Sequence, residues 1–327
     1  MRRREFMTLV GGVASWPLAV RAQQPMRQKR IAIVGPIDIT SGHPGYPALF
    51  EELRRLGYVE GRNLVVERYS AEGRTERYAE LAASVVRTNP DLILAVTGQL
   101  ALSFKNATAT IPIIASTGDP VLGGIVTNIA RPGGNITGIS TDAGFDIWGK
   151  RLALLLEAKP NLSNVRFFAS RFFWETRGET LRELAKHAGI SLAGATVDGT
   201  IDEAQHRRVF AAMEKDRVDG LVLSDEATFY PNRRLLVELA AKTRIPSVYS
   251  HRYYVEPGGL MVYSSDLADG YRRIADQIDK ILKGANPGDI PYYLATRYEL
   301  IINLKTAKAL SLTMPLSLLG QADEVIE

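Results

Sequence analysis

The sequence predicts an α/β protein made of two Rossmann-like lobes with parallel sheets and an interlobe cleft. Over most of the 327 residues, short apolar runs rich in β-branched residues alternate with amphipathic segments of helical period. A low-identity internal repeat accompanies this alternation: residues 89–94 match 217–222, and residues 111–116 match 245–250. Both copies have the order strand, helix, Ile-Pro, strand, so we expect the same α/β unit twice.

In the first half, the apolar run 30–34 predicts a buried strand, and the leucine spacing of 49–56 predicts a helix that ends at Gly57. Residues 91–96 form a continuous apolar run, which is typical of a parallel strand covered on both faces. The other expected elements of this half are strands over 63–69, 111–116 and 135–140 and a helix over 78–85.

In the second half the pattern starts again with a strand over 165–169 and a helix over 181–188. A long helix over 267–281 has one apolar face and ends at Gly284. The other expected strands are 190–197, 220–224, 247–250, 260–263 and 298–303, with helices between them and a short helix near the C-terminal end.

Residues 1–22 predict an export signal that is cleaved after Ala22. The Arg3-Arg4-x-Phe6-Met7 core resembles a twin-arginine signal, and Val20-Arg21-Ala22 carries small residues where a signal peptidase reads. The mildly apolar stretch 8–19 between them is too short to cross about 30 Å of hydrocarbon. An ordinary Sec signal with an extra arginine is the alternative. Either signal predicts a protein that works in the periplasm.

Composition excludes several classes of protein. The leader carries +3 of the net charge of +4, so the mature chain has a charge near +1 and is not expected to bind nucleic acid. The chain has no cysteine, and its four histidines lack the spacing of metal ligands. Nucleophile-elbow, P-loop and dinucleotide-binding motifs are also missing from the sequence. We therefore expect no enzyme, metal or cofactor, and no stable membrane insertion of the mature chain.

The repeat selects candidate ligand-binding positions. Thr97 and Asp225 are equivalent, since each comes six residues after the aspartate that opens a strand. Both lie just beyond the carboxyl end of a parallel strand, where open α/β sheets bind ligands. Residues 116–119 and 250–252 form a second equivalent pair of strand ends. If the lobes face each other, these four loops line one cleft.

The residue types suggest complementary roles. Thr97 and Gly98 precede a helix that begins near Gln99, and free N–H groups at a helix start bind carboxylates. Asp225 would bind a ligand ammonium through a charge-assisted hydrogen bond. For both Thr97 and Asp225, the alternative is a helix cap, and for Asp119, which precedes a proline, the cap is the expected role.

Aromatic residues follow two strands of the second half, at 172–174 and 229–230, and we expect them on loops. Such side chains stack on flat or apolar ligands, although at least half of them are expected to pack under their own loops. Arg171 would pair with a ligand carboxylate or remain solvated. The complete set of expected ligand-binding residues is Thr97, Gly98, Gln99, Ser116, Thr117, Asp119, Arg171, Phe172, Asp225, Tyr249 and His251.

Five segments carry a resemblance to a known family: LGYVEGRN at 56–63, GDPV at 118–121, RPGGNITG at 131–138, GGLM at 258–261 and NLKTAKAL at 303–310. They resemble the ABC transporter substrate-binding proteins of the tryptophan/tyrosine-binding type, over nearly all of residues 30–327. The resemblance implies a type I periplasmic-binding-protein fold with a ligand closed between the lobes. It also implies a small-molecule ligand, which is an amino acid or an aromatic compound in some members, and a membrane permease of an ABC importer as partner.

The resemblance also implies three crossovers between the lobes, which we expect near 141–144, 263–266 and 288–296. The first lobe is then 29–142 plus 265–290, and the second is 143–264 plus 291–327. A ligand-sensing module for a signalling partner would use the same cleft, and a secreted enzyme is a further alternative.

Two cleft segments depart from the family pattern. Residues 170–174 stand where members often carry an Asn-Pro-Asn loop, and residues 224–229 stand where many have Ala-Asp-Pro-Phe-Phe.

Replacing Arg3 and Arg4 together by lysine should abolish export, because the twin-arginine receptor reads the paired guanidinium groups. The measurement is the amount of mature protein in the periplasmic fraction relative to the wild type. Unchanged export would indicate the Sec route instead.

Overall fold

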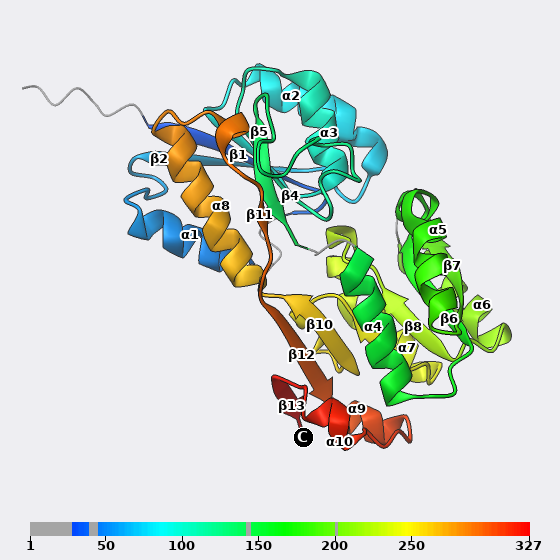
Figure 1. Ribbon diagram of the computed structural model, residues 1–327. Helices are drawn as coiled ribbons and strands as arrows, with labels where there is room; N and C mark the ends of the chain where they lie inside the picture. Colours follow the sequence, from blue (N-terminus) through cyan, green and yellow to red (C-terminus); the bar gives the residue numbers. More distant parts are fainter. Residues whose placement is uncertain (1–27, 39–44, 142–144, 200–201) are drawn as a thin grey trace, which may run out of the picture.

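The computed structural model describes residues 28–38, 45–141, 145–199 and 202–327. The chain in these ranges forms two lobes, each a sheet with helices on both faces, joined at a narrow waist (Figure 1). The first sheet has the strand order β11-β5-β4-β3-β1-β2, and the second has β13-β12-β10-β9-β8-β6-β7. The predicted two-lobed α/β class is confirmed. The expected leader, residues 1–22, lies outside the described residues.

The strands of the first sheet all pair in parallel. Alternate residues of β1 explain the two layers of helices: Ile31 and Ile33 pack toward α1 and α8, whereas Ala32 and Val34 pack toward α2 and α3. The elements are β1 (Lys29–Gly35), α1 (Gly45–Arg55), β2 (Leu64–Ser70), η1 (Thr75–Arg77), α2 (Tyr78–Arg87), β3 (Leu92–Ala95), α3 (Gly98–Ala107), β4 (Ile113–Thr117), β5 (Ile136–Ser140), α8 (Leu267–Leu282), η4 (Pro287–Asp289) and β11 (Tyr293–Leu294).

The second sheet is built in the same way. Phe167 packs toward α4 and α5, and its neighbour Phe168 packs toward α6 and α7. The C-terminal helices α9 and α10 lie at the end of this lobe that is far from the waist (Figure 1). The elements are α4 (Phe145–Ala158), β6 (Asn164–Ser170), α5 (Arg171–His187), β7 (Ser191–Val197), α6 (Glu203–Lys215), β8 (Gly220–Leu223), η2 (Ala227–Asn232), α7 (Arg233–Lys242), β9 (Ser247–Tyr249), η3 (Arg252–Tyr254), β10 (Met261–Ser265), β12 (Tyr298–Asn303), α9 (Leu304–Ala309), α10 (Leu316–Leu319) and β13 (Glu324–Ile326).

The predicted all-parallel second sheet is wrong at one pair of strands, because β12 runs antiparallel to β10. The reason is the path of the chain. Strand β10 ends at the waist, where the chain crosses to α8, and β12 begins at the waist, where the chain returns. Two adjacent strands that respectively end and begin at the same edge must run in opposite directions.

The internal repeat is visible in the hydrogen bonds that open β3 and β8. The Arg30 N–H donates to the Asp91 carboxylate over 2.8 Å, and the Asp91 N–H donates back to the Arg30 carbonyl. In the second lobe, the Asn164 N–H donates to the Asp219 carboxylate over 2.9 Å, and the Asp219 N–H returns a bond to the Asn164 carbonyl. Asp91 therefore helps to fix the register of β3 against β1, and Asp219 does the same for β8 against β6.

The waist consists of three chain segments that hydrogen-bond to one another. The Ser265 hydroxyl donates to the Thr141 carbonyl over 2.9 Å, and the Asp266 N–H donates to the Arg297 carbonyl over 3.3 Å. These contacts lie in the expected crossover regions 141–144 and 263–266, of which residues 142–144 are outside the described part. They hold the three connections side by side at the waist.

One expected lobe boundary is wrong. Residues 291–327 were assigned to the second lobe, but Tyr293 and Leu294 form β11, which pairs with Ile139 and Ser140 of β5 in the first sheet. Tyr292 is likewise buried in the core of the first lobe. The chain completes an edge of the first sheet before it crosses, so these residues belong to the first lobe.

A fully buried histidine lies in the core of the second lobe. His206 of α6 packs against the rings of Phe168 and Phe229, with centroid distances of 5.6 and 6.1 Å. Neither ring nitrogen has a hydrogen-bond partner in the described structure. Burial lowers the pKa of His206 from 6.5 to about 4, so the folded protein holds the neutral imidazole.

His206 should therefore make folding stability depend on pH. The folded state binds fewer protons than the unfolded chain between about pH 4 and 6.5, so stability that is present above pH 6.5 is lost as the pH falls through that window. His206→Leu should remove up to about 3 kcal/mol of this loss, as measured by urea unfolding at a series of pH values. His187→Leu, at an exposed position of α5, is the matched control for replacing a histidine by leucine. Equal pH dependence in the wild type and the His206 variant would contradict the assignment.

Candidate ligand-binding site

A cavity of about 370 Å³ lies between the two lobes, within the range of roughly 300–1,000 Å³ that small-ligand sites occupy. Its walls come from the carboxyl ends of β3 and β4 in the first lobe and of β6, β8 and β9 in the second. The described chain thus directs both sets of strand ends at one space. The expected residues that line it are Thr97, Gly98, Gln99, Ser116, Thr117, Asp119, Arg171, Phe172, Asp225 and His251.

Tyr249 does not line this cavity, so the expectation that it faces the cleft is wrong. Its side chain is buried in the core of the second lobe and stacks on Tyr254, with ring centroids 4.8 Å apart. Side chains alternate along a strand, and Tyr249 points to the face that α6 and α7 cover. Its neighbour His251 reaches the cavity because it lies beyond the end of β9.

The wall from the first lobe combines hydroxyl groups with a helix start. Thr97 caps α3, since its hydroxyl oxygen accepts from the Leu100 N–H over 3.2 Å. The N–H groups of Gly98 and Gln99, in the first turn, fall outside the hydrogen-bond ladder of the helix. Ser116 and Thr117 continue this wall at the end of β4. The cap role and a ligand role at the helix start are therefore compatible.

Asp119 is committed to its own loop. Its carboxylate accepts from the N–H groups of Val121 and Leu122 over 2.8 and 3.0 Å. These bonds resemble those of the expected helix cap, but the following residues form turns rather than a helix. The Asp119 carboxylate thus stabilises the turn that follows it at the edge of the cavity.

The wall from the second lobe corrects a local prediction. Residues 171–174 were expected on a loop, but they form the first turn of α5, which Ser170 caps by accepting from the Phe173 N–H over 3.1 Å. Phe173 is buried in the core of the lobe, whereas Phe172 remains 47% exposed and faces the cavity. Phe229 and Tyr230 are also buried, in η2. At least half of these aromatic residues therefore pack inside their lobe, although on helical turns rather than under loops.

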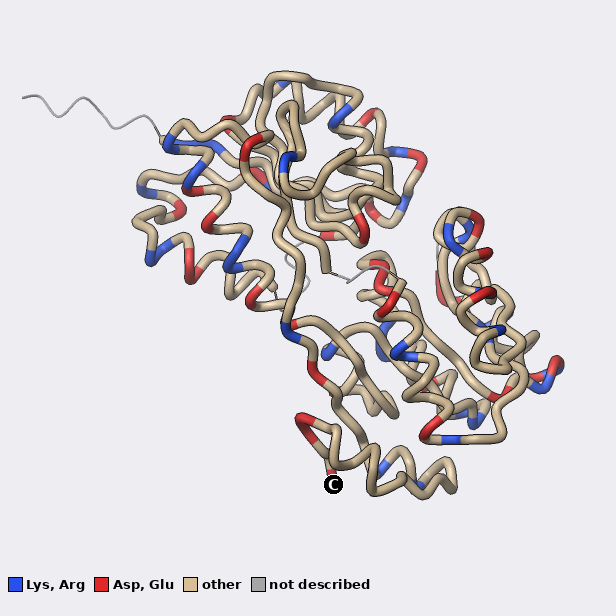
Figure 2. Tube along the Cα trace, viewed as in Figure 1, with Lys and Arg blue, Asp and Glu red and all other residues tan. Residues whose placement is uncertain are grey.

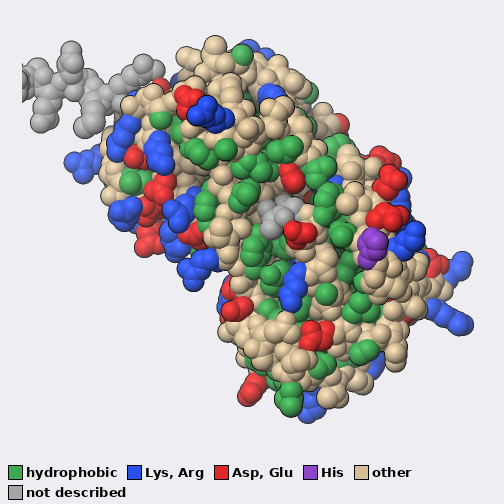
Figure 3. Space-filling model, viewed as in Figure 1, with side chains coloured by type: hydrophobic (Ala, Val, Ile, Leu, Met, Phe, Trp, Pro, Cys, Tyr) green, Lys and Arg blue, Asp and Glu red, His purple; other side chains and the backbone are tan. Residues whose placement is uncertain are grey.

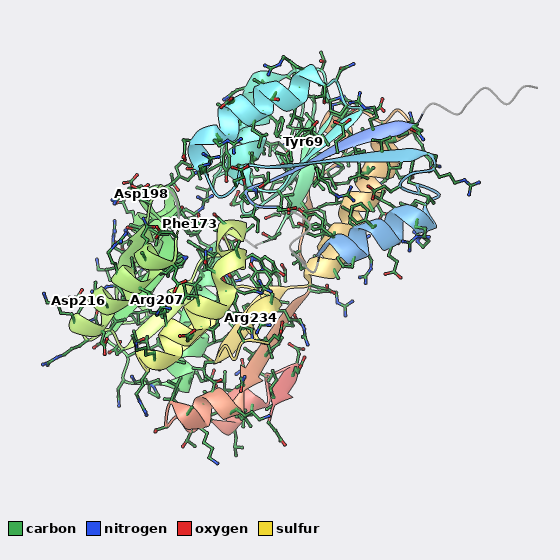
Figure 4. The ribbon with its side chains drawn as sticks, turned by 180° about the vertical axis from the view of Figure 1, so that it is seen from behind. Tyr69, Phe173, Asp198, Arg207, Asp216 and Arg234 are labelled. Atoms are coloured by element: carbon green, nitrogen blue, oxygen red, sulfur yellow. The ribbon has the colours of Figure 1, made fainter. Side chains whose placement is uncertain are left out.

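Arg171 already has a partner. Its Nε donates to the Asp198 carboxylate over 2.7 Å, and this hydrogen bond holds the pKa of Asp198 below its usual value. Figure 4 places Phe173 and Asp198 at the edge of the second lobe that faces the first, whereas Arg207, Asp216 and Arg234 lie farther away. The ion pair is exposed, and a charged ligand that used Arg171 would compete with Asp198.

Asp225 differs from Asp119 and Asp198 in the hydrogen bonding of its carboxylate. The Asp225 carbonyl contacts the His251 Nε2 over 3.0 Å, but none of the hydrogen bonds found among the described residues uses the Asp225 carboxylate. The alternative role as a helix cap is not observed, since the residue that precedes η2 is Glu226. Asp225 thus lines the cavity, and its carboxylate has no hydrogen-bond partner among the described residues.

His251 lines the cavity beside Asp225 as a neutral group. Burial lowers the pKa of His251, and its ring stacks on Tyr253 with a centroid distance of 4.8 Å. Its Nε2 is occupied by the Asp225 carbonyl, so this ring serves as a flat wall and fixes the loop after β8.

Glu226 is a cavity residue that was not expected from the sequence. Its carboxylate accepts from the Ser170 N–H over 2.8 Å, from the Ser170 hydroxyl over 2.5 Å and from the Ser224 hydroxyl over 2.8 Å. Burial raises the pKa of Glu226. The sequence did contain a signal for this network. Ser170, Ser224 and Glu226 stand at the ends of two predicted strands, in the two segments that depart from the family pattern.

Three tyrosines were also missed as cavity residues: Tyr78 of α2, Tyr271 of α8 and Tyr253 of η3. Tyr78 and Tyr271 mark the apolar faces of their helices, and that spacing predicts core packing rather than a ligand wall. Hydrophobic side chains gather along the waist in the view of Figure 3. The cavity therefore offers mostly aromatic and aliphatic surface with a few polar groups, as small-molecule sites do.

Basic and acidic residues are interspersed over both lobes of the described chain in Figure 2. In the described ranges, no group of three or more His, Cys, Asp or Glu side chains is placed to hold a metal ion. No helix within those ranges has the length and apolar character needed to span a bilayer.

Comparisons with known proteins agree with this geometry. The family model described as ABC transporter substrate binding protein matches residues 30–326. A tyrosine-binding protein of Clostridioides difficile is 25% identical over 291 residues, which cover 88% of this chain and 82% of that protein. A conserved domain protein of Vibrio cholerae has a TM-score of 0.82 at 25% identity, covering 91% of this chain and all of that one. An ABC domain of Streptococcus pneumoniae in complex with L-Trp has a TM-score of 0.79 at 22% identity with the same coverage.

The position of Tyr271 in the cavity wall depends on Gly45. A Cβ atom at Gly45 would lie 2.5 Å from Cδ2 of Tyr271, whose ring is fixed edge-on against Tyr46. Gly45→Ala should therefore destabilise the fold by about 1–3 kcal/mol through overpacking, as measured by urea unfolding. Gly149→Ala is the matched control: no described atom lies within 4 Å of its added Cβ, and the change should be neutral or stabilise α4 by up to about 1 kcal/mol. Equal stabilities of the two variants would show that the Tyr271 ring is not confined.

Proposed function

Because the chain belongs to the family of ABC transporter substrate-binding proteins, we propose that it binds an amino acid with an aromatic side chain and delivers it to the permease of an ABC importer. This is a transport family rather than a class of enzymes, and the task requires binding and release only. The observation that carries the ligand assignment is the pairing of a helix start on one lobe with an unpartnered carboxylate on the other, across an aromatic cavity.

The polar ends of an amino acid match the two lobes. The free N–H groups of Gly98 and Gln99, with the α3 dipole behind them, suit the ligand carboxylate. Asp225 suits the ligand ammonium, and charge-assisted hydrogen bonds of this kind are the strong ones. An amino acid would then be held by one charged end in each lobe, and its side chain would lie among Tyr78, Tyr253 and Tyr271.

Two relatives favour the same ligand class. The similar protein of Clostridioides difficile is a tyrosine-binding protein, and the similar domain of Streptococcus pneumoniae is in complex with L-Trp. Aromatic rings stack favourably on tyrosine and histidine rings, so a wall of this composition fits an aromatic side chain.

The mechanism is hinge closure. A ligand that contacts both lobes binds the closed arrangement more tightly than the open one, so it shifts the population toward the closed form. The three connections at the waist would absorb the change in backbone angles while the sheets remain rigid. The permease would then recognise the closed form.

The place of action follows from the leader. Residues 1–22 carry the twin-arginine type of export signal, and cleavage after Ala22 would release the mature protein into the periplasm. A twin-arginine route transports folded proteins, which suits a chain whose two lobes are each interrupted in sequence.

Direct ligand identification tests the proposed function. Native mass spectrometry of the purified protein should find a co-purified amino acid, and L-tyrosine or L-tryptophan should raise the melting temperature. A ligand at 100 times its dissociation constant stabilises the fold by about 2.7 kcal/mol. Small-angle scattering should show compaction with the same ligand. Tight binding of a ligand without an ammonium group would overturn the amino-acid assignment.

Asp225→Asn should weaken binding of L-tyrosine or L-tryptophan at least about tenfold, roughly 1.4 kcal/mol, as measured by titration calorimetry. The change keeps the side-chain shape and removes the charge that faces the ligand ammonium. Stability without ligand should hardly change. The matched control is Asp216→Asn, which removes an exposed carboxylate that pairs with Arg166 over 3.5 Å at a site remote from the cavity. Unchanged affinity in the Asp225 variant would contradict its role.

A further inference from the structure

The second-lobe wall of the cavity is held by a hydrogen-bond network that centres on Glu226. One carboxylate joins two strand ends, because Ser170 is the last residue of β6 and Ser224 directly follows β8. Ser170 contributes both its N–H, over 2.8 Å, and its hydroxyl, over 2.5 Å, whereas Ser224 contributes its hydroxyl, over 2.8 Å. The two strands are neighbours in the sheet, but their regular pairing stops at Phe168 and Leu223. Glu226 therefore continues the connection between β6 and β8 beyond the end of their own pairing.

The network continues into both flanking elements. The Ser170 hydroxyl donates to Glu226 and also accepts from the Phe173 N–H, so it links the carboxylate to the first turn of α5. On the other side, the Ser250 hydroxyl after β9 donates to the Ser224 carbonyl over 2.7 Å. Three adjacent strand ends are thus tied in series by serine side chains. The segments that this series supports are the two that carry Phe172 and Asp225 into the cavity.

Glu226 uses both oxygens of its side chain. Its Oε2 accepts from the Ser170 N–H and the Ser224 hydroxyl, and its Oε1 accepts from the Ser170 hydroxyl. A side chain without these two oxygens would leave all three donors without this partner. The ionisable groups that face Glu226 are Asp225 beside it, Tyr254 of η3 and, across the cavity, Tyr78 of α2.

We propose that Glu226 is a positioning residue of the binding site: its carboxylate locks the first turn of α5 to the loop after β8, and so fixes Phe172 and Asp225 relative to each other. The inference rests on the proposed function only for its effect on ligand affinity. The locking of the wall is a property of the protein without ligand. A binding site needs such support, because a contact group that is displaced by about 1 Å loses most of its contribution.

The ligand-free test is amide hydrogen exchange of the mature protein, followed over residues 170–176. Glu226→Ala removes both acceptor oxygens, so exchange in this segment should become at least tenfold faster while exchange in the strands of the sheet stays unchanged. Ser224→Ala removes a single bond and should give a smaller acceleration of the same segment. Glu183→Ala, on an exposed position of the same helix, is the matched control and should have no effect. Unchanged exchange over 170–176 in the Glu226 variant would overturn the proposal.

The binding test uses L-tyrosine and L-tryptophan as probes and asks whether Glu226 acts through Ser170. We expect Glu226→Ala and Ser170→Ala each to weaken binding about tenfold, and the double variant to be no weaker than the worse single one, because both changes remove the same hydrogen bonds. Additive losses would show that Glu226 contacts the ligand directly and would overturn the positioning role. If the wild type binds neither probe, the proposed ligand class fails, while the exchange experiment still decides the proposal.

Discussion

The binding site depends on one constraint: parallel strands bring all their carboxyl ends to the same edge of a sheet. In this chain, the waist holds two such edges opposite each other. The bonds among the connections, such as that from the Ser265 hydroxyl to the Thr141 carbonyl, join the lobes at the waist. The polar residues at the strand ends then line a common cavity whose walls come from both lobes. A ligand in that space would contact both lobes at once.

The carboxylates at this cavity are distributed unequally. Asp119 is bonded by the N–H groups of its own loop, Asp198 by Arg171, and Glu226 by Ser170 and Ser224. These three carboxyl groups thus connect parts of the walls to one another. Asp225 is the exception among the described cavity residues, and it is placed on a loop that the Glu226 network and His251 hold. The site thus uses most of its acidic residues as support for one that faces the ligand.

The candidate site could be predicted from the sequence only where position along a strand determined it. Thr97 and Asp225 were found because the repeat identifies strand ends, and strand ends of a parallel sheet reach the cleft. Tyr249 was misplaced because it is still inside its strand, where the side chain points into the core. Glu226 and Tyr271 were missed for different reasons: the partners of Glu226 include Ser170, which lies 56 residues away in the sequence, and Tyr271 has the spacing of a core residue. Long-range pairing of this kind leaves no local pattern.

The sequence by itself determined the order and type of most elements, the doubling of the α/β unit and the face that each helix buries, because these follow from local periodicity and from the repeat. The tertiary structure alone decided which strand ends meet, where the chain crosses between lobes and which carboxylate remains without a partner. The assignment of β11 to the first sheet is an example, since Tyr293 and Leu294 are too short a segment to show a pattern and are defined only by their bonds to β5. The physical reason is that hydrophobic period is a property of neighbouring residues, whereas hydrogen-bond satisfaction at a site depends on groups that folding brings together from distant parts of the chain.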